Sequence, residues 1–573
     1  MRDKTSLRWF GLVFISLAVA LIIVDSTIVN VAVPAIVDEL GLSSTEVQWV
    51  QEAYTLVFAS LLLLFGSLAD RFGRRRLLLI GVVLFAAASV GAAFAPSADL
   101  LIGARLVQGV GGAMMLPSTL SLLNATFRGR ERGIAFAVWG STIGGMAAVG
   151  PLLGGWLTTA FSWRWAFGIN VPLGILIIIG VLWAVNESRA ESYGRIDGVG
   201  AVLSVILFGS LVFGLIEGRT LGWWAVNDPF TIGDWTWPFD VSPVPTAFLL
   251  AALSLVAFIA WSRSRARAGK QTLLDPRLFS IATFRSGNVA ALVVALGEFG
   301  IILSLPLWLQ FVLGFSALQT GLVLLALAIG SFVASGFAGA TSGKVSPVLV
   351  VRIGLVAEII GVAGVGVVVG WDAGAGDAWG WLLPALFVYG FGVGLATAQL
   401  TGVVLQDVPV ELSGQGSGTQ STARQVGSAL GIAILGTVLF SSTAGILSSS
   451  LDDRGLPEAQ RDQVVSAVVD SAGAAISGLA DNPQTAEIGA DAKQAFSDGT
   501  RLAAFTAAGF LVIGLVATIP LGRSRREGDA EGAARTAGQA GARGAGAGAG
   551  ASEAGASEAG ASDQKGAGAP TES

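Results

Sequence analysis

The stretch Gly66–Arg76 reads GSLADRFGRRR and lies between two long apolar segments. One Asp and four Arg fall within seven of its residues, a density of charge that hydrocarbon does not tolerate. We therefore expect a tight hydrophilic turn that joins two membrane-spanning helices. Because short loops rich in Arg and Lys stay on the cytoplasmic side, this turn also fixes the side from which every later loop is counted.

The composition is that of a polytopic membrane protein. Of the 573 residues, 53% are hydrophobic and 13% are charged, and the mean hydropathy is +0.72, which a soluble domain of this size does not show. The chain contains no Cys and no His, so disulfides and thiolate metal sites are excluded and Asp or Glu must carry any protons. We expect no cofactor, no metal and no nucleic-acid partner, since no basic patch lies outside the expected cytoplasmic loops.

Apolar runs of about 20 residues, the length that a bilayer core requires, recur along the whole chain. With a retained first helix that begins near Trp9, they predict an all-α protein with fourteen transmembrane helices. We expect two six-helix bundles at residues 9–187 and 284–521, an inserted helix pair at 198–262, and a disordered tail at 522–573. The expected inner loops hold most of the Arg and Lys, so both termini should be cytoplasmic in a bacterial plasma membrane.

Two segments are expected outside the membrane on the far side. Residues 441–500 are rich in Ala, Ser and Asp, and Val464, Val468 and Leu479 recur at helical spacing. This segment is either a short amphipathic helix on the outer surface or a loose acidic loop. Four Trp between residues 223 and 237 suit an aromatic anchor at the membrane interface.

Charged side chains also fall inside the expected helices. A carboxylate at the depth of Asp25 costs roughly 2.5 to 3.5 kcal/mol on insertion scales, so it should face the protein interior. Arg105 shares one helical face with Gln108 and can hold such a carboxylate or tune its proton affinity. Glu298 lies in mid-helix among apolar residues, an environment that suits a lipophilic cation. Each of these charges also has a purely structural interpretation, in which a neighbouring helix satisfies it.

Further polar residues lie in other helices and loops. Glu358 is central in a helix that we expect at the periphery, so a structural role is favoured for it. Arg424 is expected to contact the Gly66–Arg76 turn or the basic connector at 263–285. The Gly343-Lys344 pair lacks a glycine five residues before it, so it is no phosphate-binding loop. An ion gradient is therefore the expected source of energy, and we expect no enzyme.

Several motifs resemble those of the major facilitator superfamily of secondary transporters. The Gly66–Arg76 turn resembles the family's loop between helices 2 and 3, and RLVQGVGGA, which begins at Arg105, resembles its fourth-helix motif. The string DSTIVNVAVP, which begins at Asp25, resembles the first-helix signature of its drug exporters. GPLLGGW, which begins at Gly150, is similar to the antiporter motif that separates exporters from symporters.

One motif points to a branch of that family. The string WRWAFGINVP, from Trp163 to Pro172, is closely similar to the W-R-W-x-F-x-x-N-x-P signature of the 14-helix drug:proton antiporters, the EmrB/QacA type. The resemblance spans residues 9–521 and implies a major facilitator fold of two six-helix bundles plus two inserted helices. In that fold, helices 1, 4, 9 and 12 line a central cavity.

The resemblance also implies roles for individual residues. Proton coupling is implied for Asp25, Arg105 and Glu298. The substrate cavity is implied to include Asp25, Gln108, Glu298 and Gln399. A conformational latch is implied for the first loop, where Asp70 can pair with basic residues or a helix N-terminus across the bundle interface, and it comprises Gly66, Asp70, Arg71, Gly73 and Arg74. A hinge or seam between the bundles is implied for Gly150, Pro151, Gly154 and Gly155, because Pro kinks a helix and Gly allows close helix contact.

These features together predict a proton-coupled antiporter that exports hydrophobic or cationic drugs or secondary metabolites by alternating access. Its partners would be the small-molecule substrate, protons and the lipid bilayer. Two rivals stay open. A nutrient symporter would share the architecture, although the GPLLGGW motif argues against it, and a membrane sensor would tolerate the loss of Asp25 and Arg105.

Overall fold

In the computed structural model the chain divides into two units, Met1–Thr518 and Ile519–Ser573. All the helices considered below belong to the first unit. The predicted tail at 522–573 lies outside the described residues. The structure describes residues 4–42, 44–189, 197–218, 221–232, 235–270, 272–341, 344–371, 378–471 and 473–521.

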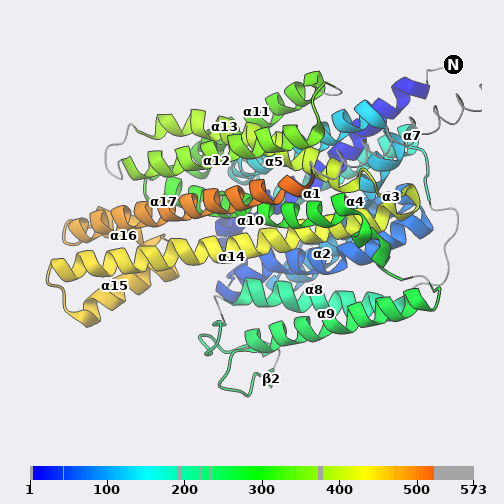
Figure 1. Ribbon diagram of the computed structural model, residues 1–573. Helices are drawn as coiled ribbons and strands as arrows, with labels where there is room; N and C mark the ends of the chain where they lie inside the picture. Colours follow the sequence, from blue (N-terminus) through cyan, green and yellow to red (C-terminus); the bar gives the residue numbers. More distant parts are fainter. Residues whose placement is uncertain are drawn as a thin grey trace, which may run out of the picture. The chain divides into compact units, whose positions relative to one another are not determined.

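The first unit is built almost wholly from helices (Figure 1). A helix satisfies its backbone groups internally, as a chain in hydrocarbon must. The N-terminal half comprises α1 (Lys4–Leu40), α2 (Ser44–Phe72), α3 (Arg74–Ala93), α4 (Ala98–Thr126), α5 (Gly129–Ala160), α6 (Arg164–Gly168) and α7 (Asn170–Ala184). The inserted pair is α8 (Gly198–Glu217) and α9 (Pro243–Arg267), with the short strands β1 (Thr231–Ile232) and β2 (Trp235–Thr236) between them.

The C-terminal half follows the connector after α9. It comprises α10 (Ala282–Phe311), α11 (Ala317–Thr341), α12 (Pro347–Trp371), α13 (Leu382–Leu405), α14 (Ser413–Asp453), α15 (Glu458–Asp470), α16 (Ala475–Asp481) and α17 (Ala486–Ala517). Short 3-10 turns at Pro276–Ser280, Ala378–Trp381 and Val410–Leu412 join some of these helices. The two halves meet where α2 packs on α14 and where α5 packs on α11 and α13.

Within the described residues, twelve helices are long and apolar enough to cross a membrane. The helices α5 and α10 belong to the fourteen expected from the sequence but are not among these twelve. The all-α class is confirmed, since the strands paired in the described part of the chain are the two-residue β1 and β2. The count of fourteen stays a prediction.

The turn between α2 and α3 is shorter and less exposed than predicted. Helix α2 continues to Phe72, and Gly73 alone separates it from α3, with a φ of 108° that favours glycine. The carboxylate of Glu187 accepts hydrogen bonds from the backbone nitrogens of Arg75 and Arg76 at 3.0 and 3.1 Å, a favourable place for a negative charge at a helix start. Within this tight turn Asp70 is fully buried.

The glycines of the GPLLGGW motif pack inside the N-terminal half. A Cβ at Gly150 would overlap the hydroxyl oxygen of Thr27, and one at Gly154 would lie 2.9 Å from the backbone oxygen of Ile28. The motif therefore lets α5 lie directly against α1, and its role as a hinge or seam between the bundles stays a prediction. The contact with the C-terminal half comes from Leu152, which packs 3.3 Å from the Cβ position of Gly321 on α11. Pro151 lies inside a continuous α5, and Gly155 is buried beside it.

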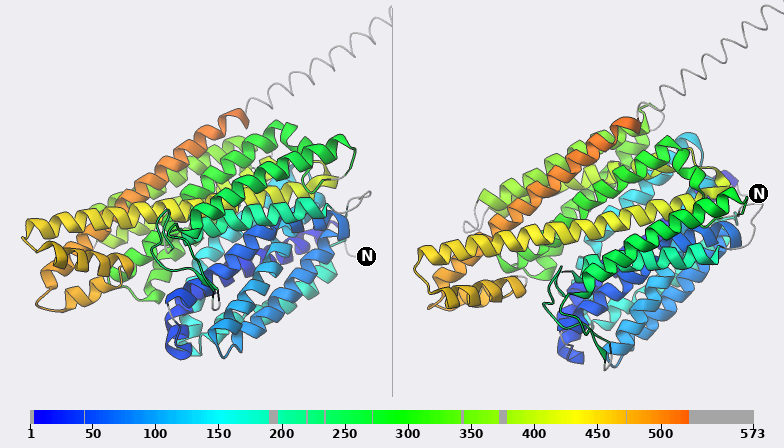
Figure 2. Two further views of the ribbon diagram at one scale, coloured as in Figure 1. Left: turned by 90° about the horizontal axis from the view of Figure 1, so that it is seen from below. Right: turned by 60° about the horizontal axis from the view of Figure 1, so that its bottom comes forward.

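The segment 441–500 is helical rather than a loose loop. Helix α14 runs on to Asp453, α15 and α16 follow, and α17 returns, at the end of the unit opposite to the start of α1 (Figure 2). Of the two alternatives, the amphipathic helix places Val464 and Leu479 in one helix, whereas in the structure they belong to α15 and α16. Arg454 forms ion pairs with Glu487 and Asp491 of α17, which fasten the two long helices together at this end.

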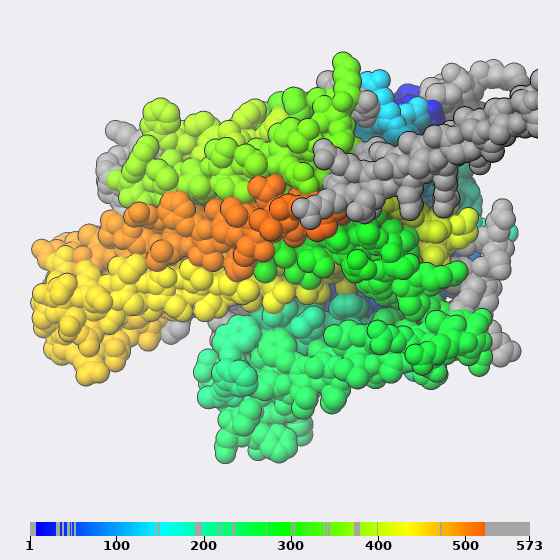
Figure 3. All heavy atoms as spheres, in the orientation of Figure 1, coloured from blue at the N-terminus to red at the C-terminus, as the bar shows by residue number. Residues whose placement is uncertain are grey.

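The inserted pair packs against the N-terminal half through contacts between α8 and α2. Asp197 caps α8 by accepting a hydrogen bond from the backbone of Gly200 at 3.0 Å, and it accepts another from the indole of Trp261 on α9 at 2.8 Å. The hairpin between the helices forms a projection in the space-filling view (Figure 3). Its Trp224 is 77% exposed and its Phe239 is 63% exposed, as suits the aromatic anchor that the sequence predicts.

Candidate transport site

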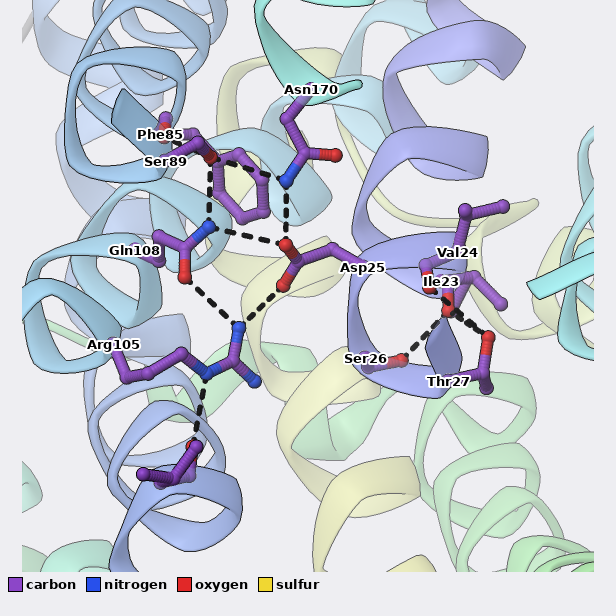
Figure 4. Close-up of polar contacts among 11 residues, drawn as sticks. Ile23, Val24, Asp25, Ser26, Thr27, Phe85, Ser89, Arg105, Gln108 and Asn170 are labelled. Carbon is purple, nitrogen blue, oxygen red and sulfur yellow. Dashed lines mark hydrogen bonds and ion pairs between the residues drawn. The ribbon is translucent and has the colours of Figure 1, made fainter. Parts of the chain in front are cut away.

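The carboxylate of Asp25, on α1, is paired with the guanidinium of Arg105, on α4 (Figure 4). Nη1 of Arg105 lies 2.6 Å from Oδ2 of Asp25, and the two residues are 1% exposed or less. Gln108, one turn along α4, accepts from Nη1 of Arg105 at 3.0 Å and donates to Oδ1 of Asp25 at 3.1 Å. The predicted face of α4 therefore does meet the predicted carboxylate of α1.

Two further side chains complete this cluster and were not selected from the sequence. Asn170, at the start of α7, donates to Oδ1 of Asp25 at 2.6 Å, and Ser89 of α3 accepts from Gln108 and Asn170 at 2.8 and 3.1 Å. Asn170 belongs to the WRWAFGINVP string, so the motif carried a signal for it. Ser89 is one small polar residue in an apolar helix, and nothing in its local pattern marks it.

The guanidinium of Arg105 is also held from α2. Its Nε donates to the backbone oxygen of Val50 at 3.0 Å, and its Cζ lies 4.5 Å from the ring centroid of Tyr54, a cation–π distance. Gly109 permits this approach, since a Cβ there would lie 2.7 Å from the backbone oxygen of Tyr54. A buried cation and a buried anion thus neutralise each other, with hydrogen bonds from four helices around them.

Glu298 of α10 lies in a second polar cluster. Its Oε1 accepts a hydrogen bond from the hydroxyl of Thr397 at 2.6 Å, and its Oε2 lies 3.0 Å from Nη2 of Arg424 on α14. The hydroxyl of Tyr389, on α13, donates to the backbone oxygen of Glu298 at 2.9 Å. The expectation that Arg424 contacts the first loop or the connector is wrong, because its guanidinium pairs with this carboxylate.

The predicted cavity residues are therefore divided between two sets of partners. Asp25 and Gln108 bond to each other and to helices of the N-terminal half, while Glu298 bonds to helices of the C-terminal half. Gln399 joins neither carboxylate through the hydrogen bond that it makes, in which it donates to the backbone oxygen of Gly133 on α5 at 3.0 Å. The expectation that Gln399 stands with Asp25 and Glu298 is thus not matched by this contact, which instead ties α13 to α5.

The predicted latch residues lie where α2 meets α14. Oδ1 of Asp70 accepts from the backbone nitrogen of Gly414 at 2.7 Å, and Oδ2 accepts from that of Gln415 at 3.0 Å. Arg74 donates to Oδ1 at 2.8 Å and also to the backbone oxygen of Val410. A Cβ at Gly66 would lie 2.5 Å from the backbone oxygen of Gly414, so only glycine permits this crossing.

Other hydrogen bonds join the two halves at the same end, which we name the Arg-rich end after the loop Gly66–Arg76. They run from α4 and α5 to α13 and α14. Arg71 lies here too, with its guanidinium 5.4 Å from the ring centroid of Phe72. The bonds are Asn124 to Ser413 at 2.9 Å, Ser121 to Ser417 at 3.2 Å, Arg132 to the backbone of Gln406 at 3.4 Å, and Gln399 to the backbone of Gly133 at 3.0 Å.

The family model described as Major Facilitator Superfamily matches residues 15–432. The chain belongs to that superfamily. It is similar to a probable actinorhodin transporter of Streptomyces coelicolor, with 34% identity over 450 residues that cover 78% of this chain and 75% of the relative. It is also similar to the multidrug efflux pump LfrA of Mycolicibacterium smegmatis, with 32% identity over 514 residues that cover 89% of this chain and 95% of the relative.

The major facilitator fold is confirmed by a solved structure as well. The proton:xylose symporter XylE has 13% identity and a TM-score of 0.56, over 90% of this chain and 95% of that one. This likeness concerns the fold alone. As a member of the superfamily, the protein is a multi-pass membrane transporter and not an enzyme. In the part of the chain that the structure describes, no group of three or more acidic residues could hold a metal ion.

Proposed function

We propose that this major facilitator is a proton-coupled antiporter that exports hydrophobic or cationic drugs or secondary metabolites. The observation that carries the proposal is the buried ion pair of Asp25 and Arg105, which joins α1 to α4 at 2.6 Å. Burying two charges in a membrane-spanning segment costs free energy. Ionisable residues at such positions are therefore rare and usually mark an ion or substrate pathway. The relatives support the substrate class, since one is described as a multidrug efflux pump and another as a probable actinorhodin transporter.

Asp25 is the proposed entry point for the proton. When its carboxylate is ionised, it neutralises Arg105 and accepts hydrogen bonds from Gln108 and Asn170. A proton on Asp25 removes that charge and leaves the guanidinium of Arg105 uncompensated. The positive charge then opposes a bound cation and loosens the contact of α1 with α4, so that proton uptake drives substrate release.

Alternating access is the proposed means of transport. The hydrogen bonds of Asp70 to the start of α14 fasten the two halves at the Arg-rich end, and the charge rule places this end in the cytoplasm. The arrangement then corresponds to a transporter closed toward the cytoplasm, with Gly66, Asp70, Arg71, Gly73 and Arg74 as its latch. Residues 9–187 and 284–521 are the two proposed moving bundles, with the inserted pair 198–262 attached to the first.

The proposed substrate cavity lies between the two carboxylate clusters. Gln108 and Asp25 would contribute polar groups from the N-terminal bundle, and Glu298 and Gln399 would do so from the C-terminal bundle. Glu298 is the proposed partner of a cationic substrate, which would compete with Arg424 for Oε2. The closely packed α1 and α5, joined at Gly150 and Gly154 beside Pro151 and Gly155, would move as one body.

The test is transport by the purified protein in proteoliposomes. With an imposed proton gradient, the wild type should move ethidium against the direction of proton flow, and Asp25→Asn should not. Movement of substrate together with protons would identify a symporter. A sensor would transport nothing, and cells that carry the wild type or Asp25→Asn would then respond equally to the drug.

A further inference from the structure

Glu358, in the middle of α12, is a carboxyl group that the proposed function does not use. It is fully buried, and neither carboxylate oxygen has a hydrogen-bond partner among the described residues. Glu298, by contrast, receives a hydrogen bond at each oxygen. A purely structural carboxyl group would be expected to bond a neighbouring helix, so the structural role favoured from the sequence does not account for Glu358.

Glycines bring α13 close to this carboxyl group. A Cβ at Gly392 of α13 would lie 2.7 Å from Cγ of Glu358, and one at Gly361 of α12 would lie 2.5 Å from Cα of Tyr389. The hydroxyl of Tyr389 reaches the backbone oxygen of Glu298. The buried group on α12 is therefore adjacent to the polar cluster of Glu298, although α12 itself lies outside it.

Three ionisable groups on other helices interact electrostatically with Glu358. They are Glu298 on α10, Arg424 on α14 and Tyr389 on α13. One cation thus stands near two carboxyl groups. Glu298 already neutralises Arg424 at 3.0 Å, so ionised Glu358 would add an uncompensated and unsolvated negative charge, which is strongly unfavourable.

Among the described residues, the Arg side chains of α12 and of α17, which packs on it, have contacts elsewhere. Arg352, on α12 itself, donates to the backbone oxygen of Thr518 at 3.0 Å. On α17, which also packs on α12, Arg501 contacts the position of Gly370, about 18 Å along the helix from Glu358 at 1.5 Å per residue. In this conformation, with Glu298 and Arg424 paired, the charges of the cluster sum to zero only when Glu358 is protonated and neutral.

We propose that Glu358 carries the proton that this transporter exchanges for a cationic substrate. With no substrate bound, Glu358 holds its proton. When a cation binds beside Glu298, the O–H bond of the Glu358 carboxyl breaks, the electron pair stays on the carboxylate, and the proton passes to water. The cation then replaces the proton, so the net charge of the site does not change. The inference rests on the proposed export of cations with proton uptake at Asp25. It adds a second protonatable group, in the C-terminal half, whose proton the bound cation replaces.

Proton release on binding tests this inference directly. Purified protein in a weakly buffered solution with a pH-indicator dye is titrated with tetraphenylphosphonium, a lipophilic cation, and binding is measured in parallel. The wild type should release about one proton for each cation bound. Glu358→Gln keeps the size of the side chain but holds no exchangeable proton, so it should release none and should bind the cation about tenfold more weakly or worse.

Matched variants separate the outcomes. Glu487→Gln removes an outer carboxylate that pairs with Arg454 and is 84% exposed, and it should behave as the wild type does. If Glu358→Gln releases as many protons as the wild type, the inference is overturned, but the proposal that the protein exports cations is not affected. A wild type that neither releases protons nor moves the cation under a proton gradient would overturn the proposed function itself. If Glu358→Gln does not fold, Glu358→Asp should shift the pH of half-maximal release, and an unchanged pH profile would overturn the inference.

Discussion

Asp70 of α2 and Gly414 of α14 are 344 positions apart in the chain, yet the carboxylate of the one lies 2.7 Å from the backbone nitrogen of the other. With the second bond to Gln415 at 3.0 Å, the carboxylate occupies the start of α14, where the helix dipole and unpaired N–H groups favour a negative charge. The contact joins the two halves of the molecule at their Arg-rich end. It therefore depends on the charge of Asp70 and not only on its size.

Asp70→Asn should insert into the membrane normally and lose most of its transport. The amide keeps the volume, but it cannot place two acceptors on α14 and it leaves Arg74 without its ionised partner. The loss should be worth about 1 to 3 kcal/mol, which shifts a two-state equilibrium by about fivefold to 150-fold. Transport in proteoliposomes measures the effect, and surface labelling from both sides measures the conformational equilibrium. The control is Asp462→Asn, in α15 at the opposite end. Normal transport in Asp70→Asn would mean that the charges of the loop set the membrane topology and do not hold the two halves together.

Glu298→Gln should separate cationic from neutral substrates. The amide cannot attract a cation, and it leaves the guanidinium of Arg424 uncompensated, so export of a cationic dye should fall by about tenfold or more. Neutral lipophilic drugs depend on apolar surface and should lose much less. Asp25→Asn gives the contrast, because loss of proton handling should abolish export of both. If Glu298→Gln exports ethidium at the wild-type rate, Glu298 does not bind the cation and has only a structural role.

Acid should weaken the contact of Glu39 with Trp163 and Arg164. The indole of Trp163, which donates to Oε2 at 2.7 Å, lowers the pKa of Glu39 below 4.5 together with Arg164, against the effect of burial. A lowered folded-state pKa stabilises the protein above the pKa of the unfolded chain, and this stabilisation is lost as the pH falls through the folded-state pKa. The Tm of the wild type should therefore fall more between pH 6 and pH 3 than that of Glu39→Gln, by a small amount since Glu39 is exposed. Equal decreases in thermal scans would contradict this.

The absence of Cys from the chain makes the topology simple to test. A single Cys at Ser477, in α16, should react with a membrane-impermeant maleimide in intact cells. One at Ala268, after α9, should react only after permeabilisation, because it lies in the Arg-rich connector. Labelling of both positions from the same side would refute the arrangement of fourteen helices with cytoplasmic termini.

Hydropathy and short motifs were sufficient for the fold class and for the first carboxylate cluster. Asp25, Arg105 and Gln108 are polar residues in apolar helices, and their cost in hydrocarbon marks them in the sequence. Ser89 carries no such cost, so its place beside Gln108 emerges only from the packing of α3 on α4. The pairing of Glu298 with Arg424 spans 126 positions, and a single sequence holds no record of which distant charges meet.

Helix boundaries were harder to predict than helix identities. The cluster of charges at Gly66–Arg76 predicted a turn of several residues. Asp70 and Arg74 neutralise each other, and Asp70 also bonds to the start of α14, so α2 remains helical as far as Phe72. The Gly residues of GPLLGGW indicated close helix contact correctly. They could not show that the partner is α1, since glycine fits any neighbour that approaches closely.

Helix α14 runs unbroken through 41 residues, from the contact with Asp70 to the ion pairs beyond Leu451. At 1.5 Å per residue, it is a rod of about 60 Å, and Arg424 is attached to it about a quarter of the way along. Because the helix is unbroken, a movement at Asp70 or at Arg424 displaces its far end as well. If α15 and α16 lie outside the cell, as the charge of the opposite end predicts, an antibody fragment that holds them should arrest the transport cycle without entering the membrane.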